Sequence, residues 1–182
     1  MKRILIFTLI LVMSVTMLAF CKRTDSDTPV GMVLASDPEI SDYSLYVPKG
    51  WTVDMSTGIT SAYVSSVDHS SVSVSYGVPS EKNLEEFWGN SKKHYDSIFE
   101  NFTVLEEGAP AKLGEYDAAR YNYTAEYEGK EYQFLQYMTI RGAYVYIFTY
   151  TAENEKSDIL GYVPYEKNLE AVLTVISEFK FK

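Results

Sequence analysis

Most of the chain alternates between apolar and polar residues, and this period of two predicts β-strands with one buried face. In residues 71–77, for example, Val72, Val74 and Tyr76 share one face, while three serines occupy the other. The same pattern predicts strands over residues 43–47, 51–55, 61–66, 71–77, 102–105, 111–113, 116–127, 132–141 and 143–151. The short turns Glu128-Gly129 and Arg141-Gly142 favour a meander for the last three strands.

Two segments follow the helical period instead. Residues 83–100 place aromatic and aliphatic side chains at helical spacing, with Ser80 or Asn83 as the N-cap and Glu85-Glu86 near the positive end of the helix dipole. Residues 165–176 turn Leu169, Val172, Leu173 and Ile176 to one side, and a short edge strand or tail follows. The aromatic stripe of the first helix is interpreted as a core-facing surface. Together with the meander, these helices predict an α+β layered domain.

The segment from Tyr43 to Val47 runs into Pro48-Lys49-Gly50-Trp51. This motif resembles the start of PsbP-like (DcrB-related) domains, in which a strand leads into Pro-x-Gly-Trp, and the order of the later elements is similar too. The resemblance covers about residues 41–182 and implies an α/β/α sandwich, a central antiparallel sheet flanked by helices. The family includes an extrinsic photosystem subunit, a nuclear transport factor and many exported bacterial lipoproteins. It has no shared catalytic residues, so none is transferred to this chain.

The N-terminus has the shape of an export signal: Met1-Lys2-Arg3, then an uncharged run over residues 4–20, then Cys21-Lys22-Arg23. As a helix, this run reaches about 25 Å, short of the roughly 30 Å of a bilayer core. This run is therefore barely long enough to form a permanent transmembrane helix. Lys22 and Arg23 also make such a helix less favourable, because positive charges at both ends weaken the charge difference that would orient it.

Leu18-Ala19-Phe20-Cys21 resembles the lipobox of bacterial lipoproteins, although Phe20 stands where a small residue is usual. The resemblance implies that residues 1–20 are a signal peptide and that Cys21 carries a diacylglyceryl group. Acyl chains contribute about 0.8 kcal/mol per buried methylene, so two or three of them hold a domain on a membrane. Two alternatives remain open, an uncleaved anchor and cleavage elsewhere followed by release.

Residues 22–39 are polar and show little periodicity apart from the brief run Met32-Val33-Leu34. We expect residues 21–40 to form a flexible tether with a mean reach of about 25 Å. The folded domain is then expected to occupy residues 41–182.

Charge and composition exclude several classes of protein. The chain has 25 acidic against 16 basic residues and a formal net charge of −9, so it would repel nucleic acid and anionic lipid headgroups. With 46% hydrophobic residues it is not a disordered chain. Its single cysteine, Cys21, excludes a disulfide framework.

Candidate chemistry is sparse, and we expect no catalytic residue, metal or cofactor. Asp68-His69-Ser70 has the composition of a hydrolytic triad, but in a turn all three side chains would lie in water. His94 lacks a second ligand one turn further, because Ile98 occupies that position. Several acids are interpreted as solubilising turn residues, with a weak divalent-cation site as an alternative: Glu106, Glu107, Glu126, Glu128 and Glu131.

The 16 tyrosines are the unusual feature of the composition, and any beyond those that pack the core favour a binding surface. We therefore expect a non-enzymatic lipoprotein, held by Cys21 on the extracytoplasmic side of a membrane in the bacterial cell envelope, that binds a protein partner or a small ligand. The alternatives are an envelope-associated hydrolase or other enzyme, and a purely structural envelope component.

Overall fold

The computed structural model describes residues 27–56 and 59–182. The expected signal peptide and Cys21 lie outside the described residues. No helix within the described ranges combines the length and the apolar character that crossing a membrane requires.

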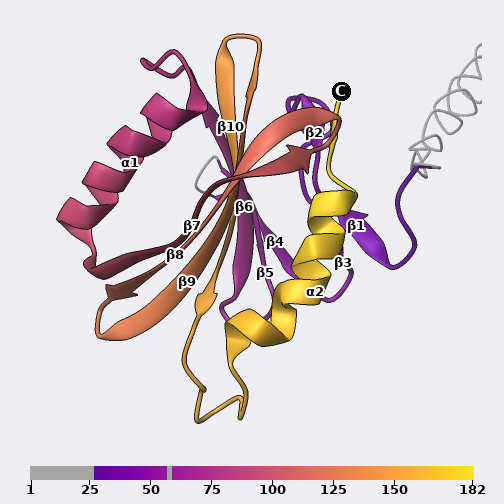
Figure 1. Ribbon diagram of the computed structural model, residues 1–182. Helices are drawn as coiled ribbons and strands as arrows, with labels where there is room; N and C mark the ends of the chain where they lie inside the picture. The colour runs from indigo at the N-terminus through magenta and orange to yellow at the C-terminus, as the bar shows by residue number, and fades with distance from the viewer. Residues whose placement is uncertain (1–26, 57–58) are drawn as a thin grey trace, which may run out of the picture.

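Seven antiparallel strands form the central sheet, in the order β4-β5-β6-β10-β9-β8-β7, and two pairs of short strands, β1-β3 and β11-β2, lie beside it (Figure 1). The elements follow one another as β1 (Met32–Leu34), β2 (Tyr43–Ser44), β3 (Tyr46–Pro48), β4 (Thr52–Asp54), β5 (Thr60–Tyr63), β6 (Ser71–Gly77), α1 (Leu84–Ile98), β7 (Glu100–Leu113), β8 (Tyr116–Tyr127), β9 (Lys130–Arg141), β10 (Tyr144–Glu153), α2 (Pro164–Ser177) and β11 (Lys180–Phe181).

The two helices cover opposite faces of the sheet (Figure 1), which confirms the α/β/α arrangement. The residues of β10 point alternately to the two faces of the sheet. Phe148 and Tyr150 belong to the core on the α2 face, whereas Ile147 packs into the cluster on the α1 face. A strand covered on both sides has few polar residues on either face. Residues 144–152 of β10 are aromatic or aliphatic apart from Thr149 and Thr151, and the one charged residue of the strand is the terminal Glu153.

The core under α1 is aromatic, as the stripe in the sequence indicates. Trp88 is buried and stacks on Tyr121 of β8 with ring centroids 4.3 Å apart. The helix begins after Asn83, whose Oδ1 accepts a hydrogen bond from the backbone N–H of Glu86 at 2.9 Å. This cap and this face were both expected from the sequence.

The larger core lies under α2. Val172 and Val175 are fully buried, and the ring of Tyr165 stacks on Tyr150 of β10 with centroids 5.1 Å apart. Tyr150 donates its hydroxyl hydrogen to the backbone oxygen of Tyr165 at 3.0 Å. The start of α2 is therefore fixed to the middle of the sheet.

The second half of the expected tether belongs to the folded domain, which corrects the boundary at residue 41. β1 pairs with β3, and Ala35 and Ser36 are buried. Ser36 Oγ donates to the backbone oxygen of Tyr43 and accepts from the N–H of Leu45, both at 3.1 Å. Three apolar residues give too little periodicity to predict a strand, but β3 supplies the hydrogen bonds that hold them.

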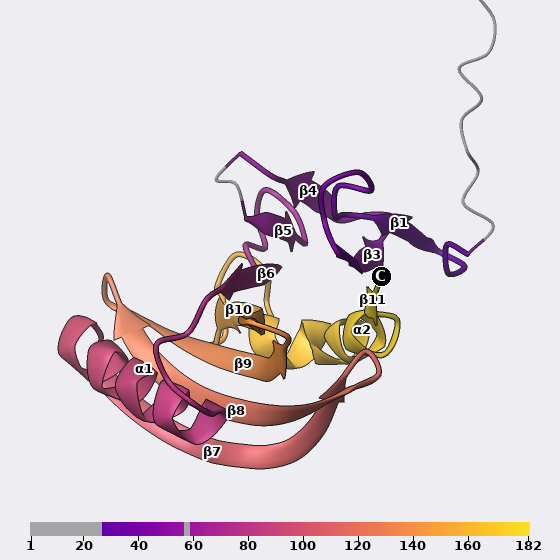
Figure 2. The same cartoon turned by 90° about the horizontal axis from the view of Figure 1, so that it is seen from above.

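Residues 102–105 and 111–113 form one long strand, β7, rather than two (Figure 2). Its pairing with β8 shifts register between Glu100 and Thr103, between Val104 and Glu106, and between Glu106 and Ala109. A bulge places two residues of one strand against one of its partner, so it breaks the alternation that sequence patterns rely on. The interruption in the sequence therefore marks bulges and not a loop.

Candidate functional site

An open cavity of about 580 Å³ lies between the segment before β2, the ends of β4 and β5, and β6. We call it the apolar cup. Its buried lining residues are Tyr43, Thr60 and Val74, which belong to the domain core or border it. Its exposed lining residues come from all three segments and are Ile40, Met55, Ile59 and Tyr76.

These rim residues are unusually accessible for their type. Ile40 is 82% exposed, Tyr76 58% and Met55 48%. Single exposed apolar side chains are ordinary on protein surfaces, but a group of them around a concave site is typical of binding sites. The volume of the cup also lies within the range of about 300–1,000 Å³ found for small-molecule pockets.

The polar groups of the cup are nearly all neutral. Tyr43 donates its hydroxyl hydrogen to Thr60 Oγ1 at 2.8 Å, and burial raises the pKa of this tyrosine, so it stays protonated. The one charged residue among those lining the cup is Asp37, whose Oδ1 accepts from the N–H groups of Glu39 and Ile40 at 2.8 and 3.3 Å. The cup therefore suits a neutral apolar group and disfavours an anionic one.

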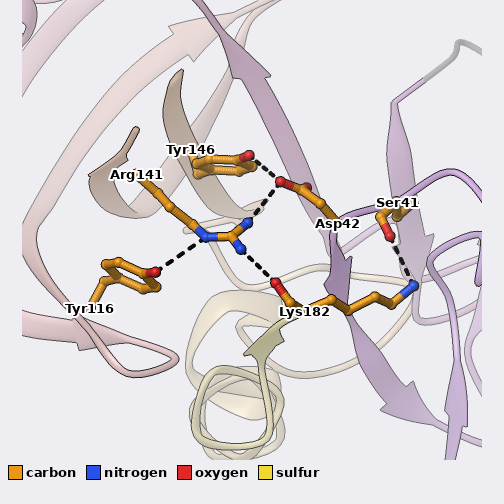
Figure 3. A network of polar contacts seen from close by, with 6 residues as sticks. All are labelled: Ser41, Asp42, Tyr116, Arg141, Tyr146 and Lys182. Atoms are coloured by element: carbon orange, nitrogen blue, oxygen red, sulfur yellow. Dashed lines mark hydrogen bonds and ion pairs between the residues drawn. The ribbon is translucent and has the colours of Figure 1, made fainter. Parts of the chain in front are cut away.

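A cluster that we call the Arg141 latch holds the wall of the cup that precedes β2. It consists of Asp42, Tyr116, Arg141, Tyr146, Phe181 and Lys182, and Figure 3 shows all of these except Phe181. Arg141 Nη1 lies 2.9 Å from Asp42 Oδ2, and Tyr146 donates its hydroxyl hydrogen to the same carboxylate oxygen. The guanidinium also lies over the Phe181 ring, 5.0 Å from its centroid. Partial burial and the bond to Asp42 raise the pKa of Tyr146 to about 12.

Lys182 completes the latch by binding three backbone oxygens of the same wall, and Figure 3 shows one of these bonds, the bond to Ser41. Its Nζ donates to Pro38 O at 2.9 Å and to Ser41 O at 2.8 Å, and its N–H donates to Asp42 O at 2.8 Å. Residues on both sides of Ile40 are therefore fixed, so the cup does not have to be ordered by its ligand.

The structure corrects the expectation that Asp68, His69 and Ser70 all lie in water. His69 is exposed, but Asp68 and Ser70 are each only 2% exposed. Asp68 Oδ2 accepts from the hydroxyl of Tyr162 at 3.0 Å and from Asn168 Nδ2 at 2.9 Å. These donors are 94 and 100 residues away along the chain, so turn-forming residues alone could not reveal them.

The arrangement around Asp68 is structural and not that of a triad. None of the hydrogen bonds found among the described residues joins His69 to Asp68 or Ser70. Burial alone would raise the pKa of Asp68, but hydrogen bonds from Ser70, Asn168 and Tyr162 outweigh it and lower that pKa. His69 lines a smaller cavity of about 190 Å³ together with Asp68 and Ser70, without contacting the carboxylate as a catalytic base would.

Among the remaining candidate residues, Glu126 of β8 and Glu131 of β9 lie directly opposite each other in the sheet, whereas His94 and Glu106 lie on other elements. His94 is exposed on α1. Glu106 lies on β7 and binds Arg120 through two bonds of 2.6 and 2.8 Å, rather than standing free at a turn. Glu126 accepts from Asn101 at 2.7 Å, and Glu131 accepts from Asn154 at 2.8 Å. The described part of the chain contains no group of three or more side chains that could hold a metal ion.

Sequence reasoning did not identify the cup or the latch. One signal was present, because Ile40, Met55 and Ile59 are large apolar residues in or beside turns, where polar residues are usual. For the latch there was no such signal, since Asp42, Arg141 and Lys182 each resemble an ordinary surface charge.

Known proteins share the fold of this chain but not its sequence. The sequence matches no family model, and no curated protein is similar enough to count as a relative. The crystal structure of LpqN, involved in cell envelope biogenesis of Mycobacterium tuberculosis, is similar with a TM-score of 0.54 and 13% identity, covering 83% of this chain and 89% of that one.

A protein of unknown function from Pseudomonas aeruginosa, PA94, is similar with a TM-score of 0.51 and 15% identity, covering 79% of this chain and 92% of that one. At these identities the likeness establishes the fold alone. The resemblance to PsbP-like domains stays a prediction. This chain therefore has an α+β sandwich fold that is also found in LpqN and PA94.

Proposed function

We propose that this protein is a lipid-anchored component of a bacterial cell envelope that binds a hydrophobic ligand or partner through the apolar cup. The cup carries the proposal, because it joins a suitable volume, an apolar rim and a wall fixed in advance by the Arg141 latch. Such preorganisation reduces the entropic cost of binding.

Two observations support the envelope location. Leu18-Ala19-Phe20-Cys21 follows an apolar run with a cationic start, as in an export signal with a lipidation site. LpqN, which has the same fold, is involved in cell envelope biogenesis. We infer that Cys21 holds the domain on the extracytoplasmic side of a membrane.

Binding without catalysis fits the chemistry of the cup. The hydroxyls of Tyr43 and Thr60, two buried residues of the lining, bond to each other, and none of the hydrogen bonds found among the described residues joins either hydroxyl to Asp37, the one charged residue of the lining. Burial raises the pKa of Tyr43, which opposes the ionised form that a nucleophile or base would use. The groups present orient an apolar guest but do not activate one.

The test uses the neutral dye N-phenylnaphthylamine, whose fluorescence rises in apolar surroundings. We expect saturable binding of one dye molecule per protein, and Ile40→Asp combined with Met55→Asp should weaken it by about tenfold or more, because a charge at the rim opposes apolar contact. Ile159→Asp is the matched control, since Ile159 is 85% exposed and lies outside the cup.

Equal losses in the double variant and in Ile159→Asp would contradict the proposal, as would the absence of saturable binding by the wild-type protein. Circular dichroism of each variant checks that the fold is retained.

A further inference from the structure

We propose that the exposed rim of the apolar cup docks on the lipid bilayer in which the protein is anchored, with the mouth of the cup facing the membrane. The rim consists of Ile40, Met55, Ile59 and Tyr76. This inference deepens the proposed function and rests on it, because it requires the lipid anchor at Cys21. It names the bilayer as the partner of the cup and membrane lipid as the source of its hydrophobic ligand.

The anchor is too short to hold the domain away from the membrane. Residues 22–26 separate Cys21 from Asp27, where the described structure begins. At about 3.3–3.6 Å per residue, Asp27 lies within about 20 Å of Cys21, whatever conformation these residues adopt. A domain of this size is roughly 40 Å across. The side of the domain that carries Asp27 therefore stays within contact range of the bilayer.

The cup lies on that side of the domain. The backbone oxygen of Gly31, just before β1, accepts from the N–H of Lys49 at 3.0 Å, so the chain is bound to the domain from this point. Even a fully extended chain from Gly31 to Asp37, the first residue that lines the cup, spans no more than about 20 Å. Figure 2 shows β1, β4 and β5 on one side of the molecule, away from α1 and β7. The strand that follows the anchor and the strands that flank the cup therefore share one side.

The apolar surface around the cup suits the membrane interface. Tyr76 has an apolar ring with a polar tip, the type of side chain that is enriched where hydrocarbon meets headgroups. Its ring packs edge-on against that of Tyr144, with centroids 5.9 Å apart, and Tyr144 is itself exposed. Val78, close to Tyr76 along the chain, is 71% exposed. The apolar rim thus continues beyond the cup as a surface that a bilayer can cover.

A small number of side chains is enough for docking, because docking is intramolecular in an anchored protein. A short tether keeps the rim at a high effective concentration relative to the bilayer, so a weak contact becomes occupied. The Arg141 latch fixes the backbone on both sides of Ile40, so this residue does not have to be ordered on contact.

The charges near the rim select the kind of lipid. Asp37 and Glu39 precede Ile40, and Asp54 precedes Met55. None of the ion pairs found among the described residues includes these three acids. The ammonium of Lys182 lies at the same wall, but it is bound to the backbone oxygens of residues 38 and 41. The rim therefore favours zwitterionic lipid and is repelled by anionic headgroups.

The test uses the full-length lipidated protein in vesicles of phosphatidylcholine that include a nitroxide-labelled phosphatidylcholine. The fluorophore NBD is attached at Met55→Cys, since the thiol of Cys21 is blocked by its lipid. Nitroxide quenches only nearby fluorophores, so we expect the emission to fall about twofold or more as the rim enters the bilayer. Ile159→Cys is the matched control, because Ile159 is 85% exposed and lies outside the cup, and its label should keep its emission.

Substitutions at the rim test which contacts cause the quenching. Ile40→Asp, added to the labelled Met55→Cys protein, should reduce quenching to the level of the control label, because a charge opposes insertion. Ile40 is 82% exposed, so the fold should not depend on it. Leu173→Asp is the matched control, since Leu173 is exposed on α2 outside the cup.

The lipid itself gives a second readout. Replacing about a third of the phosphatidylcholine by phosphatidylglycerol should weaken quenching at residue 55, because the acids near the rim are repelled by anionic lipid. Glu39→Lys should remove this weakening. Quenching that grows with phosphatidylglycerol in the protein with the natural Glu39 would contradict the role of these acids and, with it, the docking.

The remaining outcomes separate the docking from the proposed function. Equal quenching at residues 55 and 159, or quenching that Ile40→Asp leaves unchanged, would overturn the docking, and saturable binding of N-phenylnaphthylamine would show that the cup still binds ligands. Attachment of NBD to Cys21 of the wild-type protein would reveal a free thiol and refute both the anchor and the docking. A dimer in sedimentation that Ile40→Asp dissociates would show that a second copy covers the rim instead of a bilayer.

Discussion

Arg141, the last residue of β9, forms an ion pair of 2.9 Å with Asp42, which lies 99 residues earlier in the chain. The same guanidinium contacts Tyr116 and the main-chain oxygen of Lys182. One side chain therefore joins the segment before β2, the turn between β9 and β10, the start of β8 and the end of β11.

Because its contacts span four segments, Arg141→Ala should lower the free energy of unfolding by about 1–2 kcal/mol, from lost charged hydrogen bonds and the cation–π contact. Urea denaturation measures the change. Lys112→Ala is the control: the Lys112–Asp117 pair is exposed, with side-chain exposures of 63% and 95%, and such pairs contribute about 0–1 kcal/mol. Equal effects of the two substitutions would show that the latch does not hold the wall of the cup.

Gly114 and Gly142 form a matched pair for testing how tightly β11 docks. Both have positive φ, +59° and +61°, so alanine at either position should cost about 1–2 kcal/mol in backbone strain. At Gly114 a Cβ atom would also meet Phe181 Cδ2 at 3.2 Å, whereas at Gly142 it meets nothing within 4 Å. We expect Gly114→Ala to destabilise the protein more than Gly142→Ala in urea denaturation. A smaller effect at Gly114 would mean that Phe181 moves away at no cost.

Asp68 should make the free energy of unfolding depend on pH in the acid range. Its pKa in the folded state is lowered, so its carboxylate stabilises the fold above its unfolded pKa of about 3.9, and this contribution is lost as the pH falls through the lower folded value. Asp68→Asn should therefore cost about 1–3 kcal/mol at neutral pH and progressively less below about pH 3. Urea midpoints of both proteins across the acid range check this. A difference that stays constant with pH would show that the charge of Asp68 plays no part.

Cys21→Ser should release or mislocalise the protein, because serine cannot carry the thioether-linked lipid that we expect. The measurement is membrane fractionation together with metabolic labelling by palmitate, and a matched Ser26→Ala variant should behave as wild type. Labelling that persists in Cys21→Ser, or unchanged fractionation with an intact N-terminus, would contradict lipidation.

Local features of the fold could be predicted from the sequence. The N-cap at Asn83, the aromatic stripe ending near Phe99 and the turns at Glu128-Gly129 and Arg141-Gly142 all depend on neighbouring residues, and the structure contains each of them. The α+β layered domain was predicted from the strand pattern and the two amphipathic helices, and its α/β/α order from the resemblance to PsbP-like domains.

Features that depend on distant partners could not be predicted. Asp68 has the sequence context of a solvated turn, and it is buried because Tyr162 and Asn168 reach it from the other end of the chain. The cup and the latch are of the same kind, since Ile40 and Tyr76 lie in separate elements and meet only in the folded domain. The alternation within β7 was wrongly interpreted as two separate strands, because a bulge shifts the alternation of side chains without ending the strand.

The two tryptophans of the chain lie in different layers of the sandwich. Trp88 is buried in the cluster under α1, whereas Trp51 packs against the larger core on the α2 side. Intrinsic fluorescence therefore provides two reporters within one domain, which variants Trp51→Phe and Trp88→Phe can separate. Coincident melting of the two signals would mean that both layers unfold in a single cooperative step, and a gap between them would identify the layer that opens first.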